Sequence, residues 1–440
     1  MIDRSIEYCL WCIDKKNKKV PLYVKKQAKE YISIVKNKKK YIFFDEKKIN
    51  KITGLLKLMI HPDLNISIDQ GLEDYACLLI CAIFGIVDIE GNRYYETVVL
   101  EIARKNFKTF NSAIIFILLM LTDDNFSRFF SVAPDLKLSS ELKISVKKII
   151  TKSPLLQEAF KVLRSEVRCK ITDSEYIPLA YSQDKMDGKL ANAFLADEAG
   201  AMDSYPIEAM RSSQITLKSK LVIIISTKYP NDNNGFIDEV DISKKVLDGL
   251  IKDKRFSLLY EPDETIWKKD KWQKDDNVIF QANPVTVKNA TVFNAIKVSR
   301  SKAILYENKK ENFLCKHCNI QYKGLGVEGY IDINKIKQCV IKEDLDFWKG
   351  KSVFIGLDLS TTEDNTSVAM VTNVGDIIYS KVWGFIPTER LDLKTKKENV
   401  NYTQLIKDGV CFSFGYETID YSEVERFIMG LEEQYGVDIV

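Results

Sequence analysis

Two adjacent carboxylates, Asp197 and Glu198, lie near the end of an apolar stretch that runs from Ala191 to Met202 with the sequence ANAFLADEAGAM. In a nucleotide-hydrolysing fold, the first acid of such a pair holds the water shell of Mg²⁺, and the second orients the attacking water. The pattern therefore predicts a Walker B strand, with Glu198 as the catalytic carboxylate. An ordinary strand end with solvated acids is the alternative, because a hydrophobic run before Asp-Glu is a short motif.

A second candidate group is the loop Arg104–Thr109, which reads RKNFKT. Measured against the phosphate-binding pattern G-x-x-x-x-G-K-[ST], Lys108 and Thr109 match, so that the ammonium would reach the β- and γ-phosphates and the hydroxyl would ligate Mg²⁺. Both glycine positions hold other residues, Ile102 and Phe107. The second departure matters physically, because a non-glycine residue forced to positive φ costs roughly 1–2 kcal/mol.

A third candidate pair, Ser226 and Thr227, ends the apolar run LVIIIST at residues 221–227. In motor ATPases, a Ser or Thr at the tip of the strand after Walker B often senses the γ-phosphate and couples hydrolysis to movement. For these two residues alone, a simple strand-end turn is the favoured alternative. The order of the three features along the chain favours a nucleotide site.

Buried strands that alternate with helices must position these residues. The pattern predicts strands at 94–103 and 129–134, together with helices at 110–121 and 139–150. Such an alternation indicates a mostly parallel sheet with helices on both faces.

The chain is long enough for two or three domains. We predict a helical N-terminal lead-in at 1–70, a P-loop ATPase domain at 71–285, a helical linker subdomain at 286–348 and a strand-rich domain at 349–440. In the last domain, Ser422 and Glu425 have the spacing of a capping box at the start of a helix.

Composition limits the classes of protein. The chain has 440 residues, of which 45% are hydrophobic and 29% charged, as in an ordinary globular protein. The net charge of +3 does not by itself indicate a nucleic-acid-binding domain. No run approaches the ~18 apolar residues needed to span a bilayer, and nine scattered cysteines predict reduced thiols in a soluble, intracellular protein. Two histidines, His61 and His317, do not favour a histidine-based triad.

The segment Cys315-Lys-His-Cys318 has the spacing of half a structural zinc site. No second cysteine pair at short spacing follows it along the chain, and Cys339 stands alone downstream. The pattern therefore disfavours zinc.

Several stretches together resemble one family. YYETVVLEIARKNFKT at 94–109 is similar to the phosphate-loop region of tailed-phage large terminase subunits, whose loop commonly reads RKNGK[ST]. The resemblance continues in the same order through KMDGKLANAFLADEAG, VIIIST, QANP, GLDLSTTEDNTSVAMV and GVCFSFGYETIDYSEVERFI, and covers roughly residues 70–440.

The resemblance implies a DNA-packaging motor, in which an ATPase moves double-stranded viral DNA into a capsid and an RNase H-like endonuclease cuts the concatemer. It implies Glu198 as the catalytic residue and Thr109 and Asp197 as Mg²⁺ ligands, whereas Phe107 departs from the family's glycine. The residues implied to bind the ATP–Mg²⁺ cofactor are Arg104, Lys105, Asn106, Lys108, Thr109, Asp197, Ser226 and Thr227.

The same resemblance implies the partners and the location. The partners would be double-stranded viral DNA, the terminase small subunit, the portal protein of the procapsid and further copies of this chain in a ring. The protein would act in the cytoplasm of the bacterial host, away from membranes.

Asp358 in FIGLDLS matches the first metal-binding and catalytic acid of an RNase H-like nuclease. Such sites gather several carboxylates around two Mg²⁺ or Mn²⁺ ions. Asp364 is either a nearby helper or a turn-forming residue, and Asp438 is a weak substitute for the family's next acid. Because that acid would fall where the chain ends, we expect a partial nuclease domain in a C-terminally truncated chain, with doubtful nuclease activity.

The expected fold is α/β: a P-loop NTPase-type, mostly parallel sheet with flanking helices, followed by a partial RNase H-like domain. A decayed prophage terminase without ATP turnover, which at most binds DNA or assembly partners, is one alternative, favoured by Phe107 and by the end at Val440. A cellular P-loop helicase is another, and the GLDLS strand has no place in it.

Overall fold

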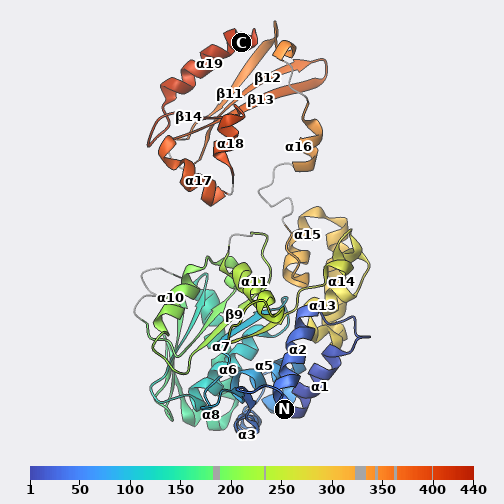
Figure 1. The fold of residues 1–440 in the computed structure, drawn as a ribbon, viewed down its shortest axis with the longest axis vertical. Coiled ribbons are helices and arrows are strands. Elements are labelled where there is room, and N and C mark those ends of the chain that lie inside the picture. Colours follow the sequence, from blue (N-terminus) through green and yellow to red (C-terminus); the bar gives the residue numbers. More distant parts are fainter. Residues whose placement is uncertain (182–188, 232–233, 323–332, 342–344, 361–363, 399) are drawn as a thin grey trace. The chain divides into compact units, whose positions relative to one another are not determined.

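The structure, a computed structural model, describes residues 1–181, 189–231, 234–322, 333–341, 345–360, 364–398 and 400–440. Residues 185–188 and 361–363, which belong to the stretches of family resemblance, lie outside the described residues. The chain forms two compact units, Met1–Asp332 and Ile333–Val440 (Figure 1).

The first unit is built on an eight-stranded sheet with the order β10-β3-β9-β8-β4-β7-β6-β5. The six strands from β10 to β7 run parallel to one another, which confirms the predicted mostly parallel sheet. Strands β6 and β5 add an antiparallel edge that was not predicted. The strands are β3 (Thr97–Glu101), β4 (Arg128–Ala133), β5 (Phe160–Val162), β6 (Val167–Cys169), β7 (Glu175–Ala180), β8 (Ala193–Asp197), β9 (Leu221–Ser226) and β10 (Arg255–Leu259).

Helices cover both faces of this sheet because neighbouring strand residues point to opposite sides. Val98 and Leu100 belong to one hydrophobic cluster and Val99 to the other. The first cluster includes side chains of α1 (Ile2–Ile13), α2 (Leu22–Val35), α3 (Glu46–Leu58), α4 (Ile68–Gly71), α5 (Asp74–Gly85), α6 (Lys108–Thr122), α7 (Leu136–Lys152) and α8 (Pro154–Ala159). The second includes side chains of α10 (Tyr205–Ser213) and α11 (Gly235–Leu247).

The apolar helices α5 and α6 lie inside the first layer. Each is buried on all sides over most of its length, from Tyr75 to Gly85 and from Asn111 to Met120. This confirms that the apolar run after the loop is a buried helix. The lead-in helices α1 to α3 share this cluster with the sheet, and β1 (Phe43–Phe44) pairs with β2 (Ile86–Val87) directly after α5.

A set of short helices follows the sheet and has a core of its own. It contains α12 (Glu264–Trp267), α13 (Asn277–Ala282), α14 (Ala290–Leu305), α15 (Glu307–Asn312) and a π-helical turn, Phe313–His317. Trp272, Ile279, Ile296 and Phe313 are among the buried members of that core. These residues lie on both sides of position 285, and the domain boundaries at 70, 285 and 348 stay predictions.

The second unit is a five-stranded sheet with the order β14-β13-β12-β11-β15. One face packs against α19 (Tyr421–Tyr435) through a cluster that includes Val353, Val368, Trp383 and Leu431. The strands are β11 (Ser352–Asp358), β12 (Thr366–Val374), β13 (Ile377–Ile386), β14 (Cys411–Ser413) and β15 (Asp438–Ile439), and the other helices are α16 (Ile333–Cys339), α17 (Leu391–Glu398) and α18 (Tyr402–Lys407).

The predicted capping box at Ser422 and Glu425 is wrong. Helix α19 begins at Tyr421, and its N-cap is Asp420, whose Oδ1 accepts a hydrogen bond from the Ser422 N–H at 2.9 Å. Ser422 therefore lies within the first turn. Asp420, two residues earlier, is the capping residue instead, because its carboxylate accepts a hydrogen bond from one of the free N–H groups at the helix start.

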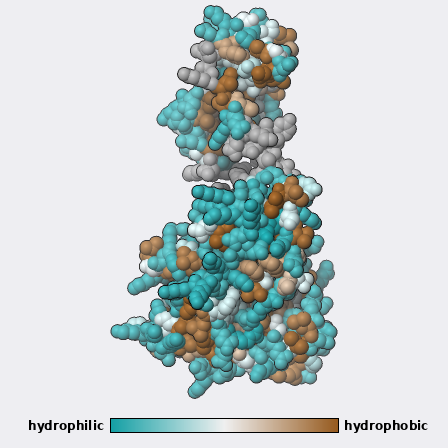
Figure 2. Space-filling model, turned by 90° about the vertical axis from the view of Figure 1, so that its right-hand side faces the viewer, coloured by the Kyte–Doolittle hydropathy of each residue, from teal (hydrophilic) through white to brown (hydrophobic). Residues whose placement is uncertain are grey.

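The face shown in Figure 2 carries many hydrophilic residues. On the face shown in Figure 2, hydrophobic residues are scattered among hydrophilic ones over the first unit, which is the usual pattern of a folded protein. Within the described part of the chain, none of the helices combines the length and the apolar character that crossing a membrane requires.

Phe116 on α6 gives a direct test of the first core. It is fully buried, and its ring lies 5.1 Å from that of Tyr176 and 6.3 Å from that of Phe129. We expect Phe116→Ala to lower the free energy of unfolding of the first unit by about 3–5 kcal/mol, measured by urea denaturation, because it leaves a cavity. The control Phe126→Ala removes a ring that is 74% exposed and should change stability little. Equal losses in the two variants would contradict this packing.

Candidate active site

The parallel strands bring the predicted residues of three segments together at the carboxyl ends of the strands, which we call the carboxyl edge of the sheet. The pairing register places Glu101 of β3 opposite Ser226 of β9, and Asp197 of β8 opposite Ile225. Strand β9 thus lies between the strand before the loop and the strand that ends in Asp-Glu. Ligands of open α/β sheets bind beyond the carboxyl ends of the strands, and the candidate residues gather at that edge.

Two residues in the loop between β3 and α6 adopt a backbone conformation that residues other than glycine disfavour. Lys105 and Phe107 both adopt left-handed conformations, with φ of 72° and 57°. The Phe107 side chain is 46% exposed. The residue therefore takes the conformation that the usual glycine would take, and much of its ring stays accessible to solvent.

Backbone N–H groups of this loop are available to an anion. Those from Lys105 to Thr109 have no acceptor among the described residues. They precede or begin α6, a fifteen-residue helix. N–H groups at a helix N-terminus, next to residues in left-handed conformation, form an anion-binding arrangement.

Lys108 joins the loop to the two carboxylates. Its Nζ forms an ion pair with Glu198 Oε1 and lies 3.7 Å from Asp197 Oδ1. All three side chains are at most 15% exposed. Glu198 itself has a left-handed backbone, with φ of 53°, and its other oxygen accepts a hydrogen bond from the Tyr229 hydroxyl at 3.0 Å.

The two carboxylates differ in their acidity. Burial raises the pKa of Asp197, although the Lys108 ammonium opposes this effect. Burial also acts to raise the pKa of Glu198, but Lys108 and the hydrogen bond from Tyr229 outweigh it, so that this pKa lies below its ordinary value. Glu198 is therefore ionised at neutral pH and can accept a proton or a hydrogen bond from water.

Ser226 and Thr227 are both buried at this edge. Ser226 Oγ accepts a hydrogen bond from the Gly200 N–H at 3.0 Å and donates one to the Thr227 carbonyl at 2.9 Å. A Cβ on Gly200 would meet Tyr229 at 2.6 Å and Ser226 Oγ at 3.0 Å, so only glycine fits there. This contact ties the end of β9 to the turn that follows Glu198.

The remaining predicted loop residues divide into two groups. The side chains of Arg104 and Lys105 are exposed, whereas that of Asn106 is buried. Asn106 Nδ2 donates to the Ala103 carbonyl at 3.0 Å and to Asn283 Oδ1 at 2.9 Å. Asn106 therefore supports the loop from inside, and only its backbone N–H is available to a ligand.

Sequence reasoning assigned no role to Asn283, Tyr229 or Lys316. Asn283 lies in the QANP stretch, which carried part of the family resemblance, and it also donates to the His317 carbonyl at 2.8 Å. Lys316 Nζ donates to Thr227 Oγ1 at 3.2 Å and lies over the Tyr229 ring. No local pattern could have found Lys316, because its partners lie almost ninety residues upstream.

The segment around Lys316 resembles half a zinc site in the sequence alone. Cys318 is fully buried in the helical core, and Cys315 Sγ lies 3.4 Å from the Tyr322 carbonyl. No group of three or more potential metal ligands of the His, Cys, Asp or Glu type occurs in the described residues. Both thiols are buried, and Cys318 is part of the packing of the helical core.

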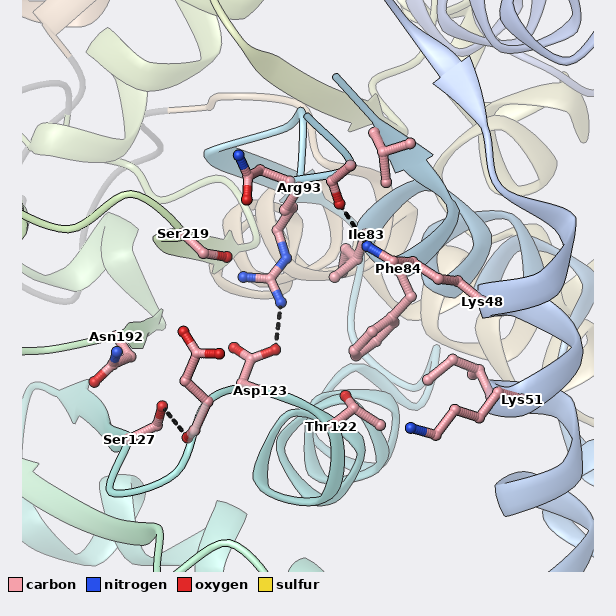
Figure 3. A pocket seen from close by; sticks show the side chains of 15 residues that line it. Lys48, Lys51, Ile83, Phe84, Arg93, Thr122, Asp123, Ser127, Asn192 and Ser219 are labelled. Carbon is pink, nitrogen blue, oxygen red and sulfur yellow. Dashed lines mark hydrogen bonds and ion pairs between the residues drawn. The ribbon is translucent and has the colours of Figure 1, made fainter. Parts of the chain in front are cut away.

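A pocket at the amino ends of the strands is separate from this site (Figure 3). Its lining includes Arg93, Asn192 and Ser219, which precede β3, β8 and β9. Arg93 Nη2 points to Asp123 and forms an ion pair with it at 2.8 Å (Figure 3). The pocket therefore lies at the amino ends of the strands, away from Lys108 and Glu198.

In the second unit, Asp358 is the last residue of β11 and is exposed. On the neighbouring strand it pairs with Ser367. Asp364 is also exposed. Asp438 pairs with Ser352 at the other end of β11, about 20 Å away at the usual rise of a strand. Asp438 therefore does not complete a site with Asp358.

Comparisons with known proteins agree on one family. A model of the terminase large subunit ATPase domain matches residues 74–245, and a model of the terminase large subunit endonuclease domain matches residues 252–440. Among curated proteins, no match was found.

Large terminases are among the solved structures that match this chain, and one of them, with a TM-score above 0.5, shares its fold. The HK97 bacteriophage large terminase is 19% identical with a TM-score of 0.52, and the match covers 88% of this chain and 78% of that one. A large terminase from a thermophilic bacteriophage is 11% identical with a TM-score of 0.37, covering 78% and 77%. The Thermus phage P74-26 large terminase ATPase domain is 12% identical with a TM-score of 0.31, covering 52% and 89%.

The surroundings of Lys316 predict a pH dependence of stability. Burial lowers the pKa of its ammonium to about 7, against the opposing effect of Glu198 and with a further contribution from Arg104. Between pH 7 and the pKa of an unfolded lysine, the unfolded chain holds a proton that the folded chain has lost. Stability conferred through this group therefore rises with pH in that range.

We expect the natural chain to gain stability relative to Lys316→Met as pH rises from 7 to 9, by up to about 1.4 kcal/mol per pH unit. Urea denaturation at pH 6, 7, 8 and 9 measures the difference. The control Lys309→Met, at an exposed position on α15, should show no such trend. Parallel curves for the natural chain and Lys316→Met would contradict the assigned environment.

Proposed function

The chain belongs to the terminase large subunit family, and from this premise we propose that its first unit is the ATP-hydrolysing motor that moves double-stranded viral DNA into a capsid. The observation that carries the proposal is the contact of Lys108 with Asp197 and Glu198 at the carboxyl edge of the sheet. This edge holds the phosphate-binding loop, the two acids and the Ser-Thr pair together, as nucleotide hydrolysis requires.

The loop would bind the phosphates of ATP. The N–H groups from Lys105 to Thr109 supply donors, and Lys108 supplies the positive charge. In the structure the Lys108 ammonium pairs with Glu198. A phosphate group would compete for this ammonium and so release Glu198 to act on water.

Thr109 and Asp197 would hold Mg²⁺. The donor set fits this ion, because hydroxyl and carboxylate oxygens are the ligands that Mg²⁺ prefers. The largely buried Asp197 carboxylate, whose pKa is raised, would gain a stronger counter-charge. Bound Mg²⁺ would supply charge neutralisation to the phosphates.

Glu198 would orient the attacking water. Its lowered pKa keeps it ionised, and Tyr229 holds one of its oxygens while the other faces Lys108.

Ser226 and Thr227 would couple the state of the nucleotide to the rest of the chain. Ser226 Oγ accepts a hydrogen bond from the Gly200 N–H in the turn after Glu198, which supports this role for Ser226.

The remaining proposals follow from family membership. DNA contact would be mainly to phosphates, which suits dispersed lysines and a small net charge. Its partners would be the terminase small subunit, the portal protein and further copies of this chain in a ring. It would act in the cytoplasm of the bacterial host.

We also propose a lead-in at 1–70, an ATPase domain at 71–285, a linker subdomain at 286–348 and a nuclease domain at 349–440.

For the endonuclease domain we propose Asp358 as one metal ligand. Cleavage by two Mg²⁺ or Mn²⁺ ions needs several carboxylates close together. The described residues contribute Asp358 at the strand end and no group of three potential ligands around it. Asp358 alone therefore does not fit a two-metal site.

A terminase without ATP turnover, acting at most as a DNA- or assembly-binding protein, is the alternative, and Phe107 is the residue that favours it. Two observations support the motor instead. The Phe107 backbone already has the left-handed conformation of the usual glycine, and its side chain is 46% exposed.

DNA-stimulated ATP hydrolysis tests the proposal. We expect the natural chain to hydrolyse ATP, and Glu198→Gln to lower kcat by about 100-fold or more, because water then lacks its acceptor. Phe107→Gly should change turnover little, because the loop conformation is already formed.

The matched control is Glu208→Gln, at an exposed position on α10, and it should behave as the natural chain does. An inert natural chain that regains turnover through Phe107→Gly would favour the alternative. Full activity in Glu198→Gln would show that another group acts on the water.

A further inference from the structure

Lys316, on the π-helical turn Phe313–His317, lies beside the proposed nucleotide site, and none of the proposed catalytic roles uses its side chain. We infer that Lys316 is a cationic ligand of the terminal phosphate of the bound nucleotide, supplied by the helical segment 313–318 to a loop far upstream in the chain. This inference rests on the proposed ATPase function and adds a third cation to that site.

The first support is the position of the ammonium. Lys316 Nζ donates a hydrogen bond to Thr227 Oγ1 at 3.2 Å and lies over the ring of Tyr229. The Tyr229 hydroxyl in turn donates to Glu198 at 3.0 Å. A single side chain thus separates the Lys316 ammonium from the carboxylate that is proposed to orient the water.

The second support is that the Lys316 backbone is fastened to the loop itself. The Arg104 N–H donates to the Lys316 carbonyl at 2.9 Å, and Asn283 donates to the carbonyl of the next residue at 2.8 Å. Phe313 and Cys318 anchor the turn in the helical core. Because the backbone is held on both sides, the long and flexible lysine stem alone can carry the ammonium from Thr227 toward a phosphate.

The third support is the missing counter-charge. Lys316 is only 8% exposed, and no carboxylate among the described residues lies within ion-pair distance of its Nζ. Burying a charge is costly unless it is paired. Burial lowers the pKa of Lys316, and although Glu198 opposes this effect, Arg104 and Lys108 add to it. An anionic ligand would supply the pairing that the protein does not.

The ion pairs at the site agree with this requirement. Lys108 is paired with Asp197 and Glu198, whereas Lys316 is not within ion-pair distance of either acid. The terminal phosphate is the part of ATP that ADP lacks. A ligand at the position of Lys316, beside Thr227 and Glu198, should therefore distinguish the two nucleotides.

Nucleotide binding by the full chain tests the inference. We would measure the dissociation constants of ATPγS and of ADP, both with Mg²⁺, by calorimetry for the natural chain, Lys316→Met and Lys309→Met. We expect Lys316→Met to weaken ATPγS binding by about 10-fold or more, because a charge-assisted contact is lost. ADP binding should stay nearly unchanged, and Lys309→Met should match the natural chain for both nucleotides.

The comparison of the two nucleotides separates a ligand from a structural residue. Equal weakening of ATPγS and ADP, or no weakening of either, would overturn the inference. If Lys316→Met does not fold, Lys316→Gln, which keeps a donor for Thr227, takes its place with the same expectation. If the natural chain binds neither nucleotide, the proposed function fails and the inference fails with it.

Discussion

The pairing of buried charges at the carboxyl edge of the sheet is the constraint on which the site depends. Lys108, Asp197 and Glu198 are largely withdrawn from water, and buried charges are stable only when they are paired. The parallel register makes the pairing possible, because it brings the ends of β3, β9 and β8 to one edge. The apolar helix α6 then has to be buried against the sheet, so that Lys108 enters the site at its N-terminus.

Local strain is concentrated at the same place. Lys105, Phe107 and Glu198 are non-glycine residues with left-handed backbone conformations, each of which costs on the order of 1–3 kcal/mol. Contacts from other segments hold these conformations. Asn106 is fixed by Asn283, and Glu198 by Lys108 and Tyr229. The helical segment after the sheet is therefore part of the candidate active site, because it holds the loop through Asn283 and Lys316.

The sequence predicted the parts of this site that depend on strand order. Parallel strands place together the residues that lie at or after their carboxyl ends. Five predicted residues have such positions: Lys108, Thr109, Asp197, Ser226 and Thr227. The α/β fold and the family were also correctly predicted. The roles of the individual site residues stay predictions.

The features that the sequence did not predict depend on contacts between distant segments, on very short strands, or on two neighbouring residues that could both cap a helix. The Asn106–Asn283 contact joins residues 177 positions apart, and no periodicity connects them. Lys316 lies between Cys315 and Cys318, which were considered only as half of a zinc site, and the sequence disfavoured that site. The antiparallel strands β5 and β6 are three residues each, too short for a clear alternation of polar and apolar residues. At α19, the nearby Asp420 took the capping position from Ser422.

Binding of a fluorescent ATP analogue with Mg²⁺ to the natural chain, beside Lys108→Ala and Lys309→Ala, tests the central claim most directly. The account predicts saturable binding that unlabelled ATP displaces, that Lys108→Ala abolishes, and that Lys309→Ala, at an exposed position on α15, keeps. No displaceable binding by the natural chain, or unchanged binding by Lys108→Ala, would contradict it.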